Sequence, residues 1–227
     1  MKNLIFIVSI GRDKHLQYCI PSVELYCKKY SVDLKVINKP FYNIPITKEY
    51  NYITFEKNQV YNHIQEYDRI LRLDSDTIIS PNAPNFFNLN PNKIYVTYED
   101  VGSRKSQRIN EIARIKKSLG DIPHWEEGYF NSGVILFSNQ HKEVFNLNLD
   151  DLKKDLGPFK EQTYLNWQVR KYDFEVVDLG KNFNHLRIFE EPWCNSNRLE
   201  ADIIHYAGPQ HNKEQKMKQD YDILYNN

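Results

Sequence analysis

The sequence predicts a single α/β domain in which helices cover both faces of a mostly parallel central sheet. The first evidence is the apolar, β-branched run Leu4–Ile10, which is typical of a strand buried on both faces. Apolar residues then recur at spacings of three and four over 16–30, the pattern of an amphipathic helix. Alternating apolar residues over 32–36 indicate a second strand. Together these segments predict a parallel β-α-β unit with a right-handed crossover.

The rest of the chain continues this alternation of strands and helices, which indicates layers on both faces of one sheet. Residues 39–55 are rich in Tyr, Pro and Asn and predict a loop, and 80–91 predicts a turn-rich segment held by two phenylalanines. Residues 104–119 predict either a basic helix or a mobile segment containing a helix. Further strands are expected at 69–73, 94–98, 133–137, 174–178 and 201–206, and further helices at 58–66 and 161–172.

Composition limits the function classes and the domain organisation. The 227 residues suffice for one large domain, which we place at residues 1–213, followed by a polar C-terminal tail at 214–227 that is helical or frayed. Thirty basic residues balance thirty acidic ones, so no nucleic acid partner is expected. Three cysteines without metal-ligand spacing fit a reducing compartment. Without a signal-peptide cleavage site or a long apolar run, we expect a soluble, cytoplasmic protein with no transmembrane segment.

Two carboxylates end the strand-like run Tyr67–Ile79, which reads YDRILRLDSDTII. Asp74 and Asp76 are two positions apart, and strand side chains alternate between faces, so both are expected to point the same way. Convergent carboxylates repel each other and lose hydration, and a cation or a shared proton must offset that cost. Ligand sites in open α/β sheets lie at the carboxyl ends of strands, which favours a functional pair over a polar strand end. A second such triplet, Asp220-Tyr-Asp222, lies in the tail, where we expect only solvated charge.

Three further segments carry side chains or turns suited to a ligand site, although each also has a plain structural interpretation. FNSG (130–133) precedes a predicted buried strand, where a glycine either allows close approach of a ligand or makes a turn. EQTYLNW (161–167) places an acid and an amide at a helix start, where an acid also favours the helix dipole. HYAGPQHNK (205–213) follows the last predicted strand and is otherwise a surface loop.

The order of LDSDT, FNSG, EQ-x-x-LN and H-x-x-G resembles that of nucleotide-sugar glycosyltransferases with the Rossmann-like GT-A fold. The resemblance is strongest to glycosyltransferase family 8, with galactosyltransferase-like and glycogenin-like members, and runs from about Leu4 to Lys213. It implies a metal-dependent enzyme that transfers a sugar from a nucleotide-diphosphate sugar, with a UDP-sugar favoured, to the hydroxyl of a glycan or other acceptor. Such a reaction belongs to glycan or polysaccharide synthesis. Retention and inversion at the anomeric carbon both stay open, as does the catalytic base, for which Glu161 and Glu127 are the acids available.

The resemblance also implies roles for individual residues. Asp74, Asp76 and His205 correspond to a metal site, and carboxylate oxygens with an imidazole favour Mn²⁺, with Mg²⁺ as the alternative. A divalent cation there bridges the diphosphate of the donor and acts as a Lewis acid. The residues that correspond to the donor-sugar contacts and the reaction centre are Asn131, Glu161 and Gln162.

The nucleotide side of the predicted site is assigned partly by resemblance and partly by position. Gly208 and Lys213 resemble the phosphate-binding end of the H-x-x-G segment, and Lys57 is either a further phosphate ligand or a solvated lysine. Trp125 and Trp193 are candidates for stacking on sugar rings, although aromatic residues more often belong to the core. The residues expected to bind the nucleotide-diphosphate sugar are Ser9, Gly11, Arg12, Lys57, Asp74, Ser75, Gly208 and Lys213.

Two other functions fit parts of the pattern. The DSDT sequence also describes the nucleophile and acid of haloacid-dehalogenase-like phosphatases, but two strands precede it here, whereas that motif normally ends the first strand. A non-catalytic nucleotide-sugar binder on the same fold is the second alternative. Transfer from a nucleotide sugar therefore stays the favoured hypothesis.

Overall fold

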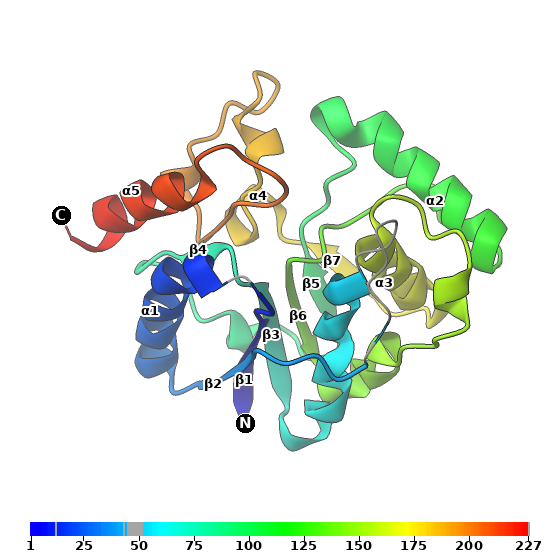
Figure 1. The fold of residues 1–227 in the computed structure, drawn as a ribbon, viewed down its shortest axis with the longest axis horizontal. Coiled ribbons are helices and arrows are strands. Elements are labelled where there is room, and N and C mark those ends of the chain that lie inside the picture. Colours follow the sequence, from blue (N-terminus) through cyan, green and yellow to red (C-terminus); the bar gives the residue numbers. More distant parts are fainter. Residues whose placement is uncertain (12, 43, 45–51, 227) are drawn as a thin grey trace.

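A computed structural model describes residues 1–11, 13–42, 44 and 52–226 and contains one central sheet of six strands (Figure 1). The strand order is β2-β1-β3-β6-β5-β7. β6 runs antiparallel to both of its neighbours, and the other adjacent pairs are parallel. The prediction of a mostly parallel sheet is therefore confirmed. The six strands are β1 (Asn3–Val8), β2 (Asp33–Ile37), β3 (Arg69–Asp74), β5 (Ile94–Val96), β6 (Val134–Ser138) and β7 (Val176–Asp178).

Side chains of β1 alternate between two cores, as the strand period of two requires. Ile5 and Ile7 belong to the core beneath α1 (Asp13–Tyr30), whereas Leu4 and Phe6 belong to the core on the opposite face. The second core includes apolar residues of α3 (Lys160–Lys171) and of the 3₁₀ segment η1 (Tyr52–Asn62). The continuous apolar run that opens the sequence thus fills both faces of the sheet, as predicted.

The helices lie on both faces of the sheet and at its edge (Figure 1). α2 (Lys105–Leu119) packs against α3 and contributes to a third core with Trp125, so the expected segment at 104–119 is a regular helix. Part of the expected loop at 39–55 lies outside the described residues, and the rest includes the start of η1. The helix expected at 58–66 is 3₁₀ rather than α. The remaining short helices are η2 (Ile64–Glu66), η3 (Phe86–Asn88), η4 (Gly102–Arg104), η5 (Asn139–Phe145), η6 (Asp151–Lys153), α4 (Gly180–Phe183), η7 (Arg187–Glu190) and η8 (Arg198–Glu200).

A second, two-stranded sheet pairs β4 (Thr77–Ile79) antiparallel with β8 (Ile203–His205). The register places Thr77 opposite His205. β3 ends at Asp74, and a turn separates it from β4, so the two aspartates do not lie on one continuous strand as the sequence pattern suggested. The turn brings Asp76 back toward the end of β3, and the pairing of β4 with β8 brings the histidine to the same place.

The C-terminal segment is a packed helix, α5 (Lys213–Tyr225). Met217 is fully buried, and Asp220 accepts hydrogen bonds at 2.7 and 2.9 Å from Nε and Nη2 of Arg198. The expectation of only solvated charge in the second aspartate triplet is therefore wrong for Asp220, whose partner is supplied by a distant part of the chain. It holds for Asp222, which is partly exposed and pairs with Lys218 within the same helix.

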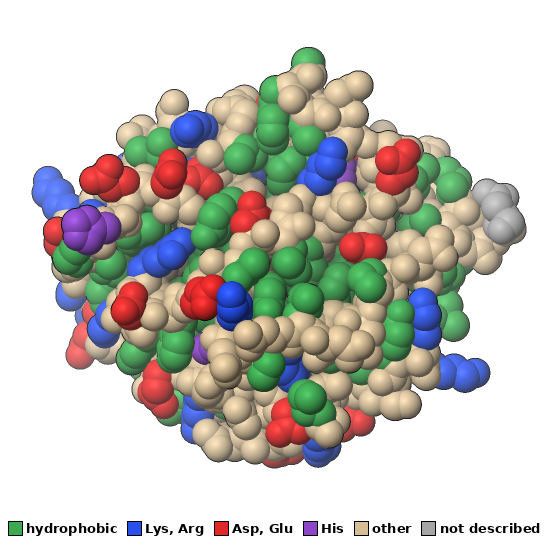
Figure 2. All heavy atoms as spheres, turned by 180° about the vertical axis from the view of Figure 1, so that it is seen from behind, with side chains coloured by type: hydrophobic (Ala, Val, Ile, Leu, Met, Phe, Trp, Pro, Cys, Tyr) green, Lys and Arg blue, Asp and Glu red, His purple; other side chains and the backbone are tan. Residues whose placement is uncertain are grey.

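The surface carries no large field of one sign on the side opposite Figure 1, where basic and acidic side chains are interspersed (Figure 2). This mixture agrees with the balanced composition and does not favour a polyanion partner there. Among the described helices, none combines the length and the apolar character needed to cross a lipid bilayer.

Burial of a neutral histidine makes the stability of the fold depend on pH. The side chain of His141 is fully buried, its Nδ1 accepts a hydrogen bond from the backbone N–H of Ser138 at 3.0 Å, and burial lowers its pKa to about 4. In the unfolded chain this histidine takes up a proton near pH 6.5, before the folded protein does. We therefore expect its contribution to the free energy of unfolding to fall by up to about 1.4 kcal/mol per pH unit between pH 6.5 and 4.

Urea unfolding of the wild type and of the variant His141→Gln at pH 7, 5.5 and 4.5 tests this expectation. The other histidines contribute equally to both proteins, so the stability difference isolates His141. The wild type is expected to lose its advantage over the variant as the pH falls. If the difference in unfolding free energy between the wild type and His141→Gln stays constant with pH, the prediction is contradicted.

Candidate active site

A cavity of about 810 Å³ opens where the ends of several strands meet. Because β6 runs antiparallel to β3, the segment just before β6 lies beside the end of β3, and the backbone N–H of Asp74 donates to the carbonyl of Gly133 at 2.7 Å. The start of α3 and the segment after β8 complete the walls. The predicted site residues that line this cavity are Lys57, Asp74, Asp76, Asn131, Glu161, Gln162, His205, Gly208 and Lys213.

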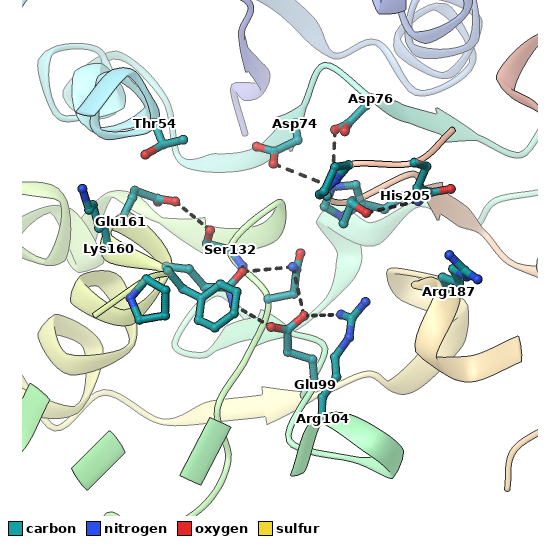
Figure 3. A pocket seen from close by; sticks show the side chains of 18 of the residues that line it. Thr54, Asp74, Asp76, Glu99, Arg104, Ser132, Lys160, Glu161, Arg187 and His205 are labelled. Atoms are coloured by element: carbon teal, nitrogen blue, oxygen red, sulfur yellow. Dashed lines mark hydrogen bonds and ion pairs between the residues drawn. The ribbon is translucent and has the colours of Figure 1, made fainter. Parts of the chain in front are cut away.

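Asp74, Asp76 and His205 form a compact group of metal-ligand type (Figure 3). One ligand atom from each lies within 4.8 Å of the others, and no other group of three or more such residues occurs in the described part of the chain. Nε2 of His205 lies 3.7 Å from Oδ2 of Asp74 and 3.4 Å from Oδ1 of Asp76. The convergence that the sequence predicted for the two aspartates is therefore present, although a turn and not strand alternation produces it.

A relay of amide side chains fixes which nitrogen of His205 faces the carboxylates. The backbone N–H of Gly133 donates to Oδ1 of Asn131 at 2.9 Å, and Nδ2 of Asn184 donates to the same oxygen at 3.1 Å. Oδ1 of Asn184 is thereby turned toward Nδ1 of His205, 3.1 Å away, and accepts its proton. In the neutral imidazole Nε2 then carries the lone pair, which is the form that binds a metal ion.

Two lysines neutralise the aspartates. Nζ of Lys57 lies 2.6 and 2.9 Å from the two carboxylate oxygens of Asp74, and Nζ of Lys213 lies 2.7 Å from Oδ2 of Asp76. Burial acts to raise the pKa of both carboxyl groups, but Lys57 and His205 beside Asp74, and His205 and Lys213 beside Asp76, outweigh it, so both pKa values lie below their ordinary range. Both aspartates are therefore ionised at neutral pH.

Gly133 is required by the close packing of the histidine. A Cβ at this position would lie 2.1 Å from Cε1 of His205 and 2.9 Å from Oδ2 of Asp74. The sequence left two interpretations of this glycine open, close approach of a ligand or a plain turn, and Gly133 does lie in a turn. In the structure it allows close approach of the side chains that form the metal-type group.

Glu161, in the first turn of α3, is buried and held at both carboxylate oxygens. Oε1 accepts from Nη2 of Arg72 at 3.1 Å, and Oε2 accepts from Oγ of Ser132 at 2.7 Å, with Nζ of Lys57 at 3.5 Å. Nη2 of Arg72 also donates to the carbonyl of Ser132 at 2.8 Å. Both carboxylate oxygens of Glu161 therefore already have hydrogen-bond partners within the protein. Glu161 places a fixed negative charge at the cavity wall (Figure 3).

Glu99, which was not among the residues selected from the sequence, anchors the part of the wall formed by Asn131 and Gln162. Its carboxylate accepts from Nε2 of Gln162 at 2.6 Å, from Nδ2 of Asn131 at 3.3 Å and from Nη1 of Arg104 at 3.0 Å. Arg108 donates to the same carboxylate. The position of Glu99 in the sequence could have indicated its role. Glu99 directly follows the predicted strand at 94–98, and ligand sites in such sheets lie at the carboxyl ends of strands.

Several predicted residues lie away from the cavity lining. Ser9, Gly11 and Ser75 do not line it, and Arg12 lies outside the described residues. Ser9 and Ser75 are buried. Of the two tryptophans considered for sugar stacking, Trp125 is buried in the third core, as the alternative interpretation held.

The six-stranded sheet with helices on both faces has the GT-A fold, which solved glycosyltransferase structures share. Residues 12–213 match the model of glycosyl transferase family 8. The chain belongs to this family and is a glycosyltransferase, as the motif order predicted. Comparison with curated proteins gives no significant match.

Solved structures share the fold at low sequence identity. The galactosyltransferase LgtC, determined with donor and acceptor sugar analogues, is 16% identical with a TM-score of 0.62, and the match covers 98% of this chain and 96% of that one. A glycosyltransferase involved in glycosylation of the major capsid of PBCV-1 is 15% identical with a TM-score of 0.61, covering 96% and 100%. GlyE of Streptococcus pneumoniae TIGR4 is 14% identical with a TM-score of 0.57, covering 100% of this chain and 62% of that one.

The variant Gly133→Ala tests whether this glycine holds the histidine against the aspartates. The new Cβ must displace His205, and overpacking of this kind costs about 1–3 kcal/mol of unfolding free energy. In a His205→Ala background the main obstacle is absent, so the same substitution is expected to cost at least about 1 kcal/mol less. Urea unfolding of the wild type, both single variants and the double variant measures the difference. Equal costs in the two backgrounds contradict the account.

Proposed function

We propose that this glycosyltransferase uses a divalent cation, Mn²⁺ or alternatively Mg²⁺, to transfer a sugar from a nucleotide-diphosphate sugar to an acceptor hydroxyl. A UDP-sugar is the favoured donor, and the reaction serves glycan or polysaccharide synthesis. The observation that carries this proposal is the group formed by Asp74, Asp76 and His205, whose ligand atoms lie within 4.8 Å of one another.

The donor set of this group fits a cation. Two ionised carboxylates face Nε2 of His205, and when the imidazole is neutral its lone pair points toward them, so a cation between the three atoms replaces their mutual repulsion with attraction. Oxygen ligands suit Mg²⁺ and Mn²⁺, and the imidazole favours Mn²⁺. When bound, such an ion supplies Lewis-acid stabilisation of the diphosphate leaving group.

Lys57 and Lys213 contribute the protein's own positive charge to the same region. Each binds one aspartate and lines the cavity, so both are placed to contact phosphate oxygens of the donor. Gly208 lies in the same wall and has a φ of 77°, a left-handed conformation that glycine adopts without strain. We assign these three residues to the diphosphate, while Ser9, Gly11, Arg12 and Ser75 stay predictions for the nucleotide.

Asn131, Glu161 and Gln162 are assigned to the donor sugar and the reaction centre. Glu161 is held by Arg72 and Ser132, so we assign it a fixed charge that stabilises positive charge developing on the sugar ring. Asn131 and Gln162 are bonded to each other at 3.0 Å and to Glu99, which orients their amides at the cavity wall. Preorganised dipoles of this kind need no rearrangement during the reaction.

The alternatives have less support. The DSDT segment leads out of the third strand of the chain, and the family match covers most of the sequence, so neither observation favours a phosphatase. The match to a glycosyltransferase family likewise does not favour a non-catalytic binder.

Binding of UDP with Mn²⁺ is the first test of the proposed function. At a ligand concentration of about 100 times Kd, binding adds about 2.7 kcal/mol to the free energy of unfolding. For a chain of this size about 1 kcal/mol corresponds to roughly 2–4 °C in Tm, so we expect a shift of roughly 5–10 °C that requires both ligands. Differential scanning fluorimetry with UDP, with Mn²⁺ and with both measures it.

The variant Asp76→Asn is expected to lose the joint shift. Asp222→Asn is the matched control, because Asp222 belongs to the second aspartate triplet, is partly exposed on α5 and pairs only locally, with Lys218 and Asn226. That control should keep the full shift. A joint shift that survives Asp76→Asn, or that never appears in the wild type with UDP, GDP or another nucleoside diphosphate, contradicts the proposal.

A further inference from the structure

The cavity carries more positive charge than the proposed donor needs. Six lysine and arginine side chains and four carboxylates line it. A divalent cation balances the charge of a nucleotide-sugar diphosphate, so the bound donor does not consume this excess. The excess positive charge is therefore available to the second substrate, the acceptor.

Arg187 is the clearest source of that excess. It lies on η7, is exposed and lines the cavity. Its guanidinium has no hydrogen bond or ion pair to any other residue that the structure describes, and Figure 3 shows it beside the His205 end of the cavity. A guanidinium presents a planar fork of donors that matches a carboxylate or a phosphate. Such a group left without a partner at a substrate cavity indicates an anionic ligand.

The carboxylates nearest to Arg187 in sequence are engaged elsewhere. Glu190 lies 3.6 Å from Nη1 of Arg198 and 3.5 Å from Nζ of Lys216. Glu191 accepts from Oγ and the backbone N–H of Ser103 at 2.6 and 3.2 Å. Neither neutralises Arg187 in the folded protein.

A second arginine lies on the wall that faces η7. Arg104 is half-buried, lines the cavity and pairs with Glu99 through Nη1, while Arg108 pairs with the same carboxylate. The single carboxylate of Glu99 thus pairs with two guanidinium groups, so this wall also carries net positive charge. The hydrogen bonds of Ser103 to Glu191 tie this segment to the loop that follows η7.

An exposed aromatic ring lies between these two segments. Trp193 is 49% exposed and packs on Gly102, two positions before Arg104, where an added Cβ would lie only 2.2 Å from Nε1. Its Nε1 donates to Glu191 at 3.2 Å, which fixes the ring. A rigid indole with an exposed face offers a flat apolar surface of the kind on which a sugar ring stacks.

We infer that the acceptor is an anionic glycan, whose carboxylate or phosphate is bound by Arg187 and Arg104 and whose sugar ring lies on Trp193. The identification of this ligand as the acceptor rests on the proposed function. The binding site itself rests on the unpaired Arg187, the shared Glu99 and the exposed indole. A neutral glycan leaves Arg187 without a partner, whereas an acidic one forms charge-assisted hydrogen bonds with it.

Calorimetric titration with three matched probes tests this inference. The probes are a glucose-terminated disaccharide and its counterparts terminated by glucuronate and by glucose 6-phosphate. Each is titrated with and without UDP and Mn²⁺. At least one acidic probe is expected to bind about tenfold more tightly than the neutral one, and the preference should weaken at high salt. The carboxylate and phosphate probes distinguish the two sources of the anion.

Variants separate charge recognition from stacking. Arg187→Gln should reduce the preference for the acidic probes, with Arg104 holding the remainder, and should not unfold the protein, because Arg187 has no structural partner. Lys117→Gln removes an equal charge from an exposed position on α2 that does not line the cavity, and should keep the preference. Trp193→Ala should weaken the binding of all three probes by a similar factor.

Acidic probes that bind less than threefold more tightly than the neutral probe, or not at all, overturn the inference, as does a preference that Arg187→Gln leaves undiminished. Failure of UDP and Mn²⁺ to bind overturns instead the proposed function. The titrations without these ligands still decide whether the site selects anionic glycans.

Discussion

Two ionised carboxylates share one buried position in this protein, and the surrounding structure compensates their repulsion. Asp74 and Asp76 meet at the end of the central sheet, where Asp76 is buried and Asp74 is partly buried. Unpaired charges in such a place cost several kcal/mol. The chain meets this requirement with a lysine for each aspartate, supplied by segments far apart in the sequence. The same requirement makes the position attractive to a divalent cation.

Hydrogen bonds among the polar groups behind the aspartates fix the orientation of the side chains at this position. The backbone N–H of Gly133 sets the orientation of Asn131, Asn131 sets that of Asn184, and Asn184 holds the proton of His205 on Nδ1. The lone pair of Nε2 consequently faces the carboxylates. Asn131 also joins this relay to Glu99 and the start of α3, so the metal-type group and the sugar-side residues form one connected network.

Much of this site follows from local sequence pattern. The first strand, α1 and the strand that ends at Asp74 are marked by periodic burial, which short stretches of sequence record directly. The amino-acid order alone also placed Glu161 and His205 at strand or helix ends. What escaped prediction depends on long-range partners. The pairing of β4 with β8 changes the path between the aspartates, and Asp220 is buried because Arg198 lies opposite it. No local pattern reports either contact.

The central claim is that His205 and the two aspartates bind one divalent cation together. Pulsed electron paramagnetic resonance of the protein with Mn²⁺ and UDP tests it directly, because a coordinated imidazole gives a nitrogen hyperfine coupling to the manganese. We predict one tightly bound Mn²⁺ per chain with such a coupling, and loss of the coupling in His205→Ala. Tightly bound Mn²⁺ without nitrogen coupling in the wild type, or an unchanged coupling in the variant, would contradict the account.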